Sequence, residues 1–295
     1  MNPYASIAGL DLDHSGLRHT AAPRGLVRVD GPDAAGFLHR LCSQDVSGLG
    51  VGATAPAAFL TPKGKLVATV WIGRLPDTLL LDCQVDQRAA IAELLERFHF
   101  SEKVQITAMP DFVCHELWGR GAERVCREVG GGMWIGGSWL GLHWMRVFQP
   151  ADATPPWPDA PALGHEHREL LRILSGQVLV GVDVDATTLG PEAGLGEALC
   201  RTKGCYTGQE IVARIDTYGH VNRQLCLVTI AGEAAVAVGA ALCDPADGEP
   251  VGRALSSAVA EGRRHALALV PADFARAGAA LRLDGRAVTV ERVFA

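Results

Sequence analysis

The stretch Lys203-Gly204-Cys205-Tyr206-Thr207-Gly208-Gln209-Glu210 predicts both a local structure and a chemistry. Thr207 and Glu210 have the spacing of a capping box, in which a threonine side chain caps a helix and a glutamate three residues later reaches back. Apolar residues continue at helical spacing, so we predict a helix over about 208–218 that ends at Gly219. If Thr207 is the cap, its replacement by alanine should cost roughly 0.5–2 kcal/mol.

Cys205 precedes this predicted cap by two residues. A helix N-terminus carries partial positive charge, and Arg201 and Lys203 add to it, so a thiolate or a bound anion is favoured there. Tyr206 offers an aromatic wall. The residues alone leave three interpretations open: a reactive cysteine, an anion site, or a buried cysteine beside an ordinary capped helix.

The composition of the 295-residue chain excludes several protein classes. A net charge of -6 argues against a dedicated nucleic-acid binder, because phosphate binding leaves a basic footprint. No apolar run approaches the ~20 residues of a membrane span, and no secretory pattern opens the chain. The eight cysteines form no CxxC pair, so we expect reduced thiols in the cytoplasm. Cys200, Cys205 and His220 lack a fourth ligand, and we predict no metal site.

The N-terminal part has the pattern of an α+β unit of split-βαβ type. Apolar runs and turn residues predict strands and helices in alternation. The expected strands are 26–29, 57–60, 66–72, 79–83 and 104–108, and the expected helices are 34–41, begun by Asp33, and 86–98.

A second α/β region follows over about 111–190, with one helix at 165–174. From about residue 223 the pattern changes to short strands separated by Gly, Asp and Pro turns, which is typical of a small β-barrel or sandwich. The strands expected there include 225–230, 250–254, 266–270, 281–283 and 288–293, with Val236 and Leu242 in shorter ones.

The octapeptide 203–210 resembles the signature of the YgfZ family, folate-binding proteins related to the T-protein (aminomethyltransferase) of the glycine cleavage system. Three other stretches carry the same resemblance. They are Phe59-Leu60-Thr61-Pro62-Lys63-Gly64-Lys65, Gly31-Pro32-Asp33-Ala34 with Gln44-Asp45-Val46, and Pro191-Glu192-Ala193-Gly194-Leu195. The resemblance covers nearly the whole chain and is weakest within 111–165.

The resemblance implies an α+β fold of three domains in a ring around a folate channel. It implies a ferredoxin-like domain over 1–110, a central α+β domain over 111–222 and a β-barrel domain over 223–295, and it allows the first two to be discontinuous in sequence. It further implies tetrahydrofolate as cofactor, and a role in assembling or repairing iron–sulfur clusters in client enzymes, including the tRNA-methylthiolating enzyme. Cys205 is then the reactive thiol. The implied folate-binding residues are Lys203, Tyr206, Gln209, Glu210, Arg214, Glu192 and Arg223.

Two departures from the T-protein weaken the case for aminomethyl transfer. The T-protein has an acidic pair after the first hairpin, where this chain reads Lys65-Leu66-Val67-Ala68-Thr69. It also has a glutamate that grips the pterin, at a place that Leu174 occupies here, so a charge-assisted partner is lost. We therefore expect an iron–sulfur accessory protein. The alternatives are a one-carbon transferase and a non-catalytic scaffold in which Cys205 is structural.

Overall fold

The computed structural model describes residues 17–119, 121–128, 133–139, 142–155, 157, 160–219 and 221–294. The helices are α1 (Ala34–Leu41), α2 (Arg88–Arg97), α3 (Ala122–Glu128), α4 (His165–Leu174) and α5 (Gln209–Tyr218). Single 3-10 turns lie at η2 (Val85–Gln87), η3 (Pro191–Ala193) and η4 (Gly196–Ala198). No helix in these described ranges is long and apolar enough to cross a membrane.

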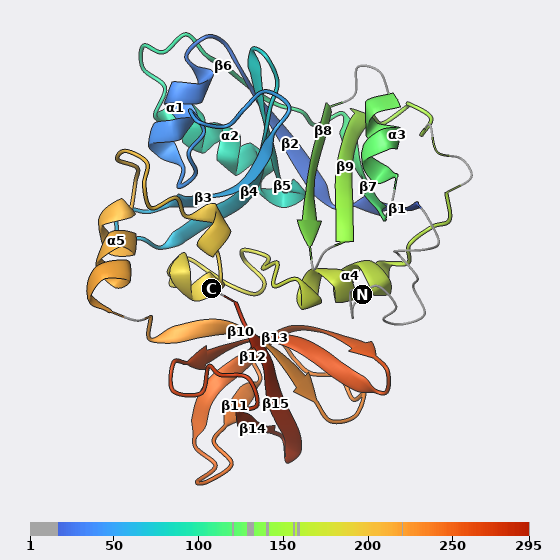
Figure 1. The fold of residues 1–295 in the computed structure, drawn as a ribbon, viewed down its shortest axis with the longest axis vertical. Helices are drawn as coiled ribbons and strands as arrows, with labels where there is room; N and C mark the ends of the chain where they lie inside the picture. Colours follow the sequence, from blue (N-terminus) through green and yellow to red (C-terminus); the bar gives the residue numbers. More distant parts are fainter. Residues whose placement is uncertain are drawn as a thin grey trace. The chain divides into compact units, whose positions relative to one another are not determined.

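The strands fall into two open sheets and a closed barrel (Figure 1). Those of the two sheets are β1 (Arg18–Ala22), β2 (Arg24–Asp30), β3 (Thr54–Leu60), β4 (Leu66–Arg74), β5 (Thr78–Gln84), β6 (Gln105–Ala108), β7 (Phe112–Trp118), β8 (Met133–Trp139) and β9 (Leu142–Pro150). Those of the barrel are β10 (Arg223–Ile230), β11 (Ala241–Cys243), β12 (Pro250–Ala260), β13 (Arg263–Pro271), β14 (Ala280–Leu283) and β15 (Arg286–Val293).

The chain forms two compact units. The first comprises the described parts of Met1–Phe59, Ala68–Gly164 and Thr202–Thr207. The second comprises Leu60–Val67, His165–Arg201 and the described parts of Gly208–Ala295. The predicted three-domain boundaries stay a prediction.

The first unit contains a five-stranded sheet in the order β3-β4-β5-β2-β6. Helices α1 and α2 bury Phe37, Leu38 and Leu95 in a core shared with these strands. Strand β5 is buried along almost its whole length, because its alternate residues serve two faces. Leu79 and Leu81 belong to the helix-facing core. The other face carries the fully buried Asp82.

Asp82 joins this sheet to the second sheet of the same unit, whose order is β1-β7-β9-β8. Its carboxylate accepts hydrogen bonds from Arg24 Nε at 2.6 Å and from Arg146 Nη1 at 2.5 Å. Arg146, on β9, also donates through Nε to Glu116 Oε1 at 2.9 Å. Buried charges are tolerated where they are paired and hydrogen-bonded, and two arginines here face two carboxylates.

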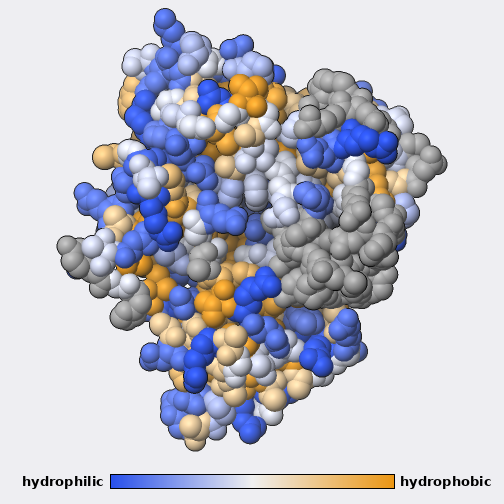
Figure 2. Space-filling model, in the orientation of Figure 1, coloured by the Kyte–Doolittle hydropathy of each residue, from blue (hydrophilic) through white to orange (hydrophobic). Residues whose placement is uncertain are grey.

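The second unit contains the closed barrel, with strand order β10-β13-β12-β11-β14-β15. Helix α4 packs against β12 and β13 (Figure 1). Hydrophilic and hydrophobic residues are interspersed over the barrel on the face seen in Figure 2. The interior is apolar, with Val228, Leu281 and Val290 among its buried residues.

Asp183, in the segment 175–190 that follows α4, stabilises a bulge in β12. The pairing register of β12 with β13 shifts between Ala254 and Ser257, which takes Ser256 out of the ladder. Asp183 Oδ1 accepts the Ser256 N–H at 2.9 Å, and its Oδ2 accepts the Leu179 N–H at 2.8 Å. Arg172 of α4 donates to the same carboxylate at 2.8 Å. One buried side chain therefore connects α4, the segment and the barrel.

Most sequence-based elements are confirmed, including α1 and α4 at the predicted bounds and the barrel. Other details differ from the prediction. The helix expected over 86–98 begins as the 3-10 turn η2 and ends at Arg97. Strands β1, β7, β8 and β9 and helix α3 were not predicted individually, and Val236 lies outside the barrel strands.

Candidate functional site

The signature motif is divided between the two units. Thr202–Thr207 packs with the first unit, whereas the chain on either side of it belongs to the second. Within these six residues, which we call the Cys205 segment, Lys203 and Tyr206 are buried, at 8% and 7% exposure. Gly204 and Cys205, which lie between them, are exposed. The segment is thus anchored on both sides of the thiol.

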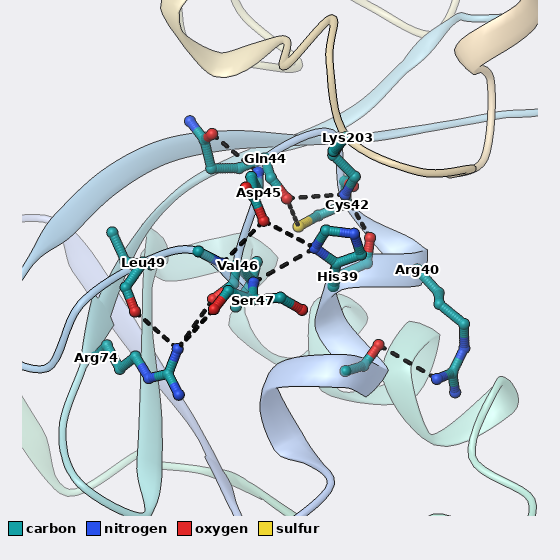
Figure 3. A network of polar contacts seen from close by, with 12 residues as sticks. His39, Arg40, Cys42, Gln44, Asp45, Val46, Ser47, Leu49, Arg74 and Lys203 are labelled. Atoms are coloured by element: carbon teal, nitrogen blue, oxygen red, sulfur yellow. Dashed lines mark hydrogen bonds and ion pairs between the residues drawn. The ribbon is translucent and has the colours of Figure 1, made fainter.

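Lys203 is anchored by the C-terminal end of α1 (Figure 3). Its ammonium donates to the carbonyl oxygens of His39, Cys42 and Gln44, which we call the α1 carbonyl cage. The bonds to Cys42 and Gln44 are both 2.8 Å long. The last carbonyls of a helix lack partners within it and carry partial negative charge, so a buried ammonium is favoured there.

Lys203 also contacts the second anchor. Its Nζ lies 5.0 Å from the centroid of the Tyr206 ring, within the range of a cation–π interaction. An ammonium has three N–H donors, and the α1 carbonyl cage offers it three acceptors. These contacts place Lys203 in the framework of the Cys205 segment. Contact between Lys203 and a folate tail stays a prediction.

The chain that follows α1 is held by a second cation, which sequence reasoning missed. Arg74 Nη1 donates to the carbonyl oxygens of Val46, Ser47 and Leu49, at 3.3, 3.2 and 2.7 Å (Figure 3). Lys203 and Arg74 thus bind opposite ends of one segment from His39 to Leu49. No spacing in the sequence signals these contacts, because both cations bind backbone atoms far away in the chain.

His39 lies beside the α1 carbonyl cage. Its Nδ1 is 3.2 Å from Asp45 Oδ1 and 3.4 Å from the Ser47 backbone nitrogen. Burial and the nearby Lys203 ammonium lower the pKa of His39, and Asp45 opposes them. A neutral imidazole is therefore favoured next to Lys203.

Cys205 differs from the other cysteines by its exposure. Of the seven whose side chains the structure describes, it alone is exposed. Burial raises the pKa of Cys83 to about 12 and that of Cys226 to about 12. It also raises the pKa of Cys42 and of Cys114. Because a thiolate is the nucleophile and the metal ligand, these four thiols are inert at neutral pH.

The predicted capping box is wrong. Helix α5 begins at Gln209, its N-cap is Gly208, and no side chain caps it. Gly208 has φ +84°, a conformation that residues with a Cβ rarely adopt. A Cβ added there would lie 2.6 Å from the Thr61 carbonyl oxygen. The tertiary contact with the β3–β4 hairpin, rather than a threonine cap, sets the start of α5.

This contact brings three of the quoted motifs together in the second unit. Gly64, at the tip of the β3–β4 hairpin, packs against Gly208 and Ile211 of α5. On its other side the hairpin bonds to the loop before η3, with the Leu66 N–H donating to Thr188 O at 2.9 Å. The motif at 61–65, which forms the tip of the hairpin, therefore contacts both the start of α5 and the loop that leads into the motif at 191–195.

The remaining predicted site residues lie in the second unit. Glu192, on η3, is only 3% exposed, and its Oε2 accepts the Leu189 N–H at 2.9 Å. Arg223 donates to both Glu192 oxygens at 3.3 Å, and its side chain is 39% exposed. On α5, Gln209 is half-buried, while Glu210 and Arg214 are exposed. The structure thus joins Glu192 to Arg223 and places Gln209, Glu210 and Arg214 along one helix.

The two T-protein positions without carboxylates can also be located. Val67 is 39% exposed on β4, and Leu174 is 1% exposed at the end of α4. Within the described residues, no three His, Cys, Asp or Glu side chains converge as metal ligands. His220, considered above as a ligand, lies outside those residues.

The chain is similar to two iron–sulfur cluster assembly factors and to a plant protein. It is 27% identical over 258 residues to the mitochondrial iron–sulfur cluster assembly factor IBA57 of Mus musculus, which covers 78% of this chain and 72% of that one. The IBA57 homologue of Mycosarcoma maydis is 25% identical over 75% of this chain and 59% of its own. A putative chloroplastic transferase of Arabidopsis thaliana is 26% identical over 68% of this chain, and only 53% of its own length is spanned. All three names place those proteins in organelles, so a cytoplasmic location stays a prediction here.

A solved structure shows the fold. The glycine cleavage system aminomethyltransferase T of Bartonella henselae superposes with a TM-score of 0.80 at 20% identity, covering 95% of this chain and 88% of that one. No protein-family model matches the chain. The predicted α+β fold with a C-terminal barrel is therefore confirmed as T-protein-like, and the relatives in sequence include iron–sulfur cluster assembly factors.

Proposed function

We propose that this chain is an iron–sulfur cluster assembly factor that uses Cys205 as its working thiol. The observation that carries the proposal is the exposure of Cys205 between two buried anchors, in a chain whose other described cysteines are buried or half-buried. Cysteine thiolate is the usual protein ligand of iron–sulfur clusters, so an exposed thiol can contact a cluster or the sulfur of a client. The similarity to two assembly factors supports this role.

Restoration of a client enzyme tests the proposal. Cells that lack their own factor would receive the wild-type chain, Cys205→Ser or Cys243→Ser, the last being a half-buried cysteine. We expect wild type and Cys243→Ser to restore the activity of a [4Fe–4S] enzyme, and Cys205→Ser to fail while it accumulates normally. Full restoration by Cys205→Ser would rule out the thiol. Methylthio modification of tRNA in the same cells tests the tRNA-methylthiolating enzyme as a client.

If the protein is a non-catalytic scaffold, Cys205 should be no more reactive than an ordinary thiol. Iodoacetamide labelling of the folded protein at several pH values, followed by peptide mass spectrometry, gives the rate at each cysteine. A working thiol should react at Cys205 well before the buried cysteines and faster than a model thiol. A Cys205 that matches the model thiol in rate and pH midpoint supports the scaffold.

Tetrahydrofolate is part of the proposal, and its fit to these residues is partial. The T-protein-like fold supports folate binding. Arg223 and Arg214 could meet the negatively charged tail, and Gln209, Glu210 and Tyr206 are the polar and aromatic groups of the same motif. At the pterin position, however, the buried Leu174 supplies no carboxylate. We therefore expect weaker binding than in a protein with that glutamate. Calorimetric titration with tetrahydrofolate tests whether the wild type binds it and whether Arg223→Gln binds it more weakly. If neither protein releases heat, folate is removed from the proposal.

A one-carbon transferase is the second candidate, favoured by the fold alone. The positions of Val67 and Leu174 argue against it, because neither supplies the carboxylate that the resemblance assigns to transfer. A single-turnover assay with a one-carbon donor and tetrahydrofolate decides between the two. Formation of methylene-tetrahydrofolate would favour the transferase.

A further inference from the structure

We propose that Lys203 is the positioning residue of Cys205: by filling the α1 carbonyl cage it holds the Cys205 segment in place without any ligand. The inference rests on the proposed function in one respect, namely that Cys205 is the working thiol. It assigns Lys203 to the framework of the site, where the family resemblance assigns it to the cofactor.

The first support is the location of the segment. Thr202–Thr207 packs with the first unit, although Arg201 and Gly208 on either side belong to the second. Six residues that leave one unit and return within so short a span need strong local contacts. Lys203 and Tyr206 are the two of the six that are buried, so these two side chains are the buried anchors of the segment.

The second support is the chemistry of the α1 carbonyl cage. Three backbone carbonyls converge on one ammonium. They come from the last turn of α1 and from the chain just after it, where the helix dipole is negative. A lysine suits this cage because its ammonium is a compact charge that carries three N–H donors on one atom, one for each carbonyl oxygen.

The third support is the setting of the thiol itself. Gly204 has no atom within 4 Å of the place where a Cβ would lie, so the space beside Cys205 is open. Lys203 and Tyr206 flank this open stretch and touch each other. The anchors therefore fix the backbone on both sides of Cys205 and leave the thiol accessible.

Hydrogen exchange of the ligand-free protein tests the inference. The variant is Lys203→Met, and the matched control is Lys103→Met, which removes an exposed lysine of the same unit. We expect Lys203→Met to speed amide exchange at least about tenfold in the peptides that cover 202–207 and 39–45, because a charge-assisted hydrogen-bond cluster is lost. Lys103→Met should leave both peptides unchanged.

A readout on His39 separates positioning from a general loss of stability. Since Lys203 helps to lower the pKa of His39, its removal should raise that pKa, which NMR titration of the imidazole measures. Unchanged exchange in both peptides and an unchanged His39 pKa, with tetrahydrofolate affinity lost, would overturn the inference and make Lys203 a ligand-binding residue.

Two further measurements keep the test decisive. If Lys203→Met does not fold, the ammonium protons of Lys203 in the wild type should be visible by NMR near neutral pH, because three hydrogen bonds slow their exchange. Their absence would contradict the cage. If Cys205→Ser restores a client while Lys203→Met shows the expected exchange, the proposed function fails and the positioning of the segment stands.

Discussion

Two glycines of the signature motif have different physical roles. Gly208 adopts φ +84° and lies against the hairpin backbone, whereas Gly204 has open space where a side chain would begin. The sequence shows the two as equivalent partners of Cys205. Only the packing of the β3–β4 hairpin distinguishes them.

Substitution by alanine measures this difference. Gly208→Ala places a Cβ 2.6 Å from the Thr61 carbonyl oxygen in a left-handed conformation, so it should destabilise the protein by about 2–4 kcal/mol. Gly204→Ala should change the free energy of unfolding by less than about 0.5 kcal/mol. Urea unfolding of both variants gives the two values. Equal effects would mean that the hairpin does not pack on α5 as described.

The sequence predicts that Thr207 caps α5 and that its loss destabilises the protein, and the structure changes this expectation. Since Gly208 is the N-cap and no side chain caps α5, Thr207→Ala should cost less than about 0.5 kcal/mol. Chemical unfolding of the variant checks this value. A loss near 1 kcal/mol or more would restore the capping box.

At the scale of elements, Asp183 joins α4 to the bulged strand β12. It is 1% exposed and accepts from two backbone N–H groups and from Arg172. A bulge leaves a backbone donor without its ladder partner, and a buried donor without any partner is expensive. Asp183 supplies the acceptor and balances the Arg172 charge.

Asp183→Asn should therefore cost about 3 kcal/mol, because it leaves part of a buried arginine charge uncompensated while Glu169 remains. Asp216→Asn is the control: it breaks the exposed pair with Arg201 and should cost no more than about 1 kcal/mol. Thermal unfolding of both proteins gives the comparison. Similar losses in the two variants would show that Asp183 contributes little through its charge.

At the scale of the whole molecule, three histidines make stability depend on pH. Burial lowers the pKa of His39, His115 and His265 below the ordinary 6.5. Near these pKa values the unfolded chain binds more protons than the folded one. The contribution of the three histidines to the free energy of unfolding is therefore complete above about pH 6.5, and it is lost as the pH falls through their lowered pKa values. The raised pKa of the half-buried His99 acts in the opposite direction, and among the described histidines it is one group against three.

We expect the urea concentration at the unfolding midpoint to decrease when the pH is lowered from about 7.5 to about 5.5, a range above the pKa of most carboxylates. His265→Gln should flatten this fall, because it removes one of the three groups. A midpoint that is constant or higher at the acid end would contradict the lowered pKa values of these three half-buried histidines.

Much of this protein follows from sequence pattern alone. Helices α1 and α4 appear at their predicted bounds, because a helical stripe such as Leu170, Leu171 and Leu174 is buried wherever the helix docks. The short strands after residue 223 likewise predict a β-barrel or sandwich, and the structure has a closed barrel. These patterns depend on the periodicity of neighbours in the chain, which any tertiary arrangement must respect.

Only the tertiary structure decided which groups the polar side chains of the site contact. The sequence alone determined that Cys205 lies in an unusual glycine-flanked motif beside a lysine. It could not determine that Lys203 binds carbonyls about 160 residues away, or that Gly208 rather than Thr207 begins α5. Backbone carbonyls are the same at every residue and leave no mark in the sequence, so a cage made of them becomes visible only when the chain is folded.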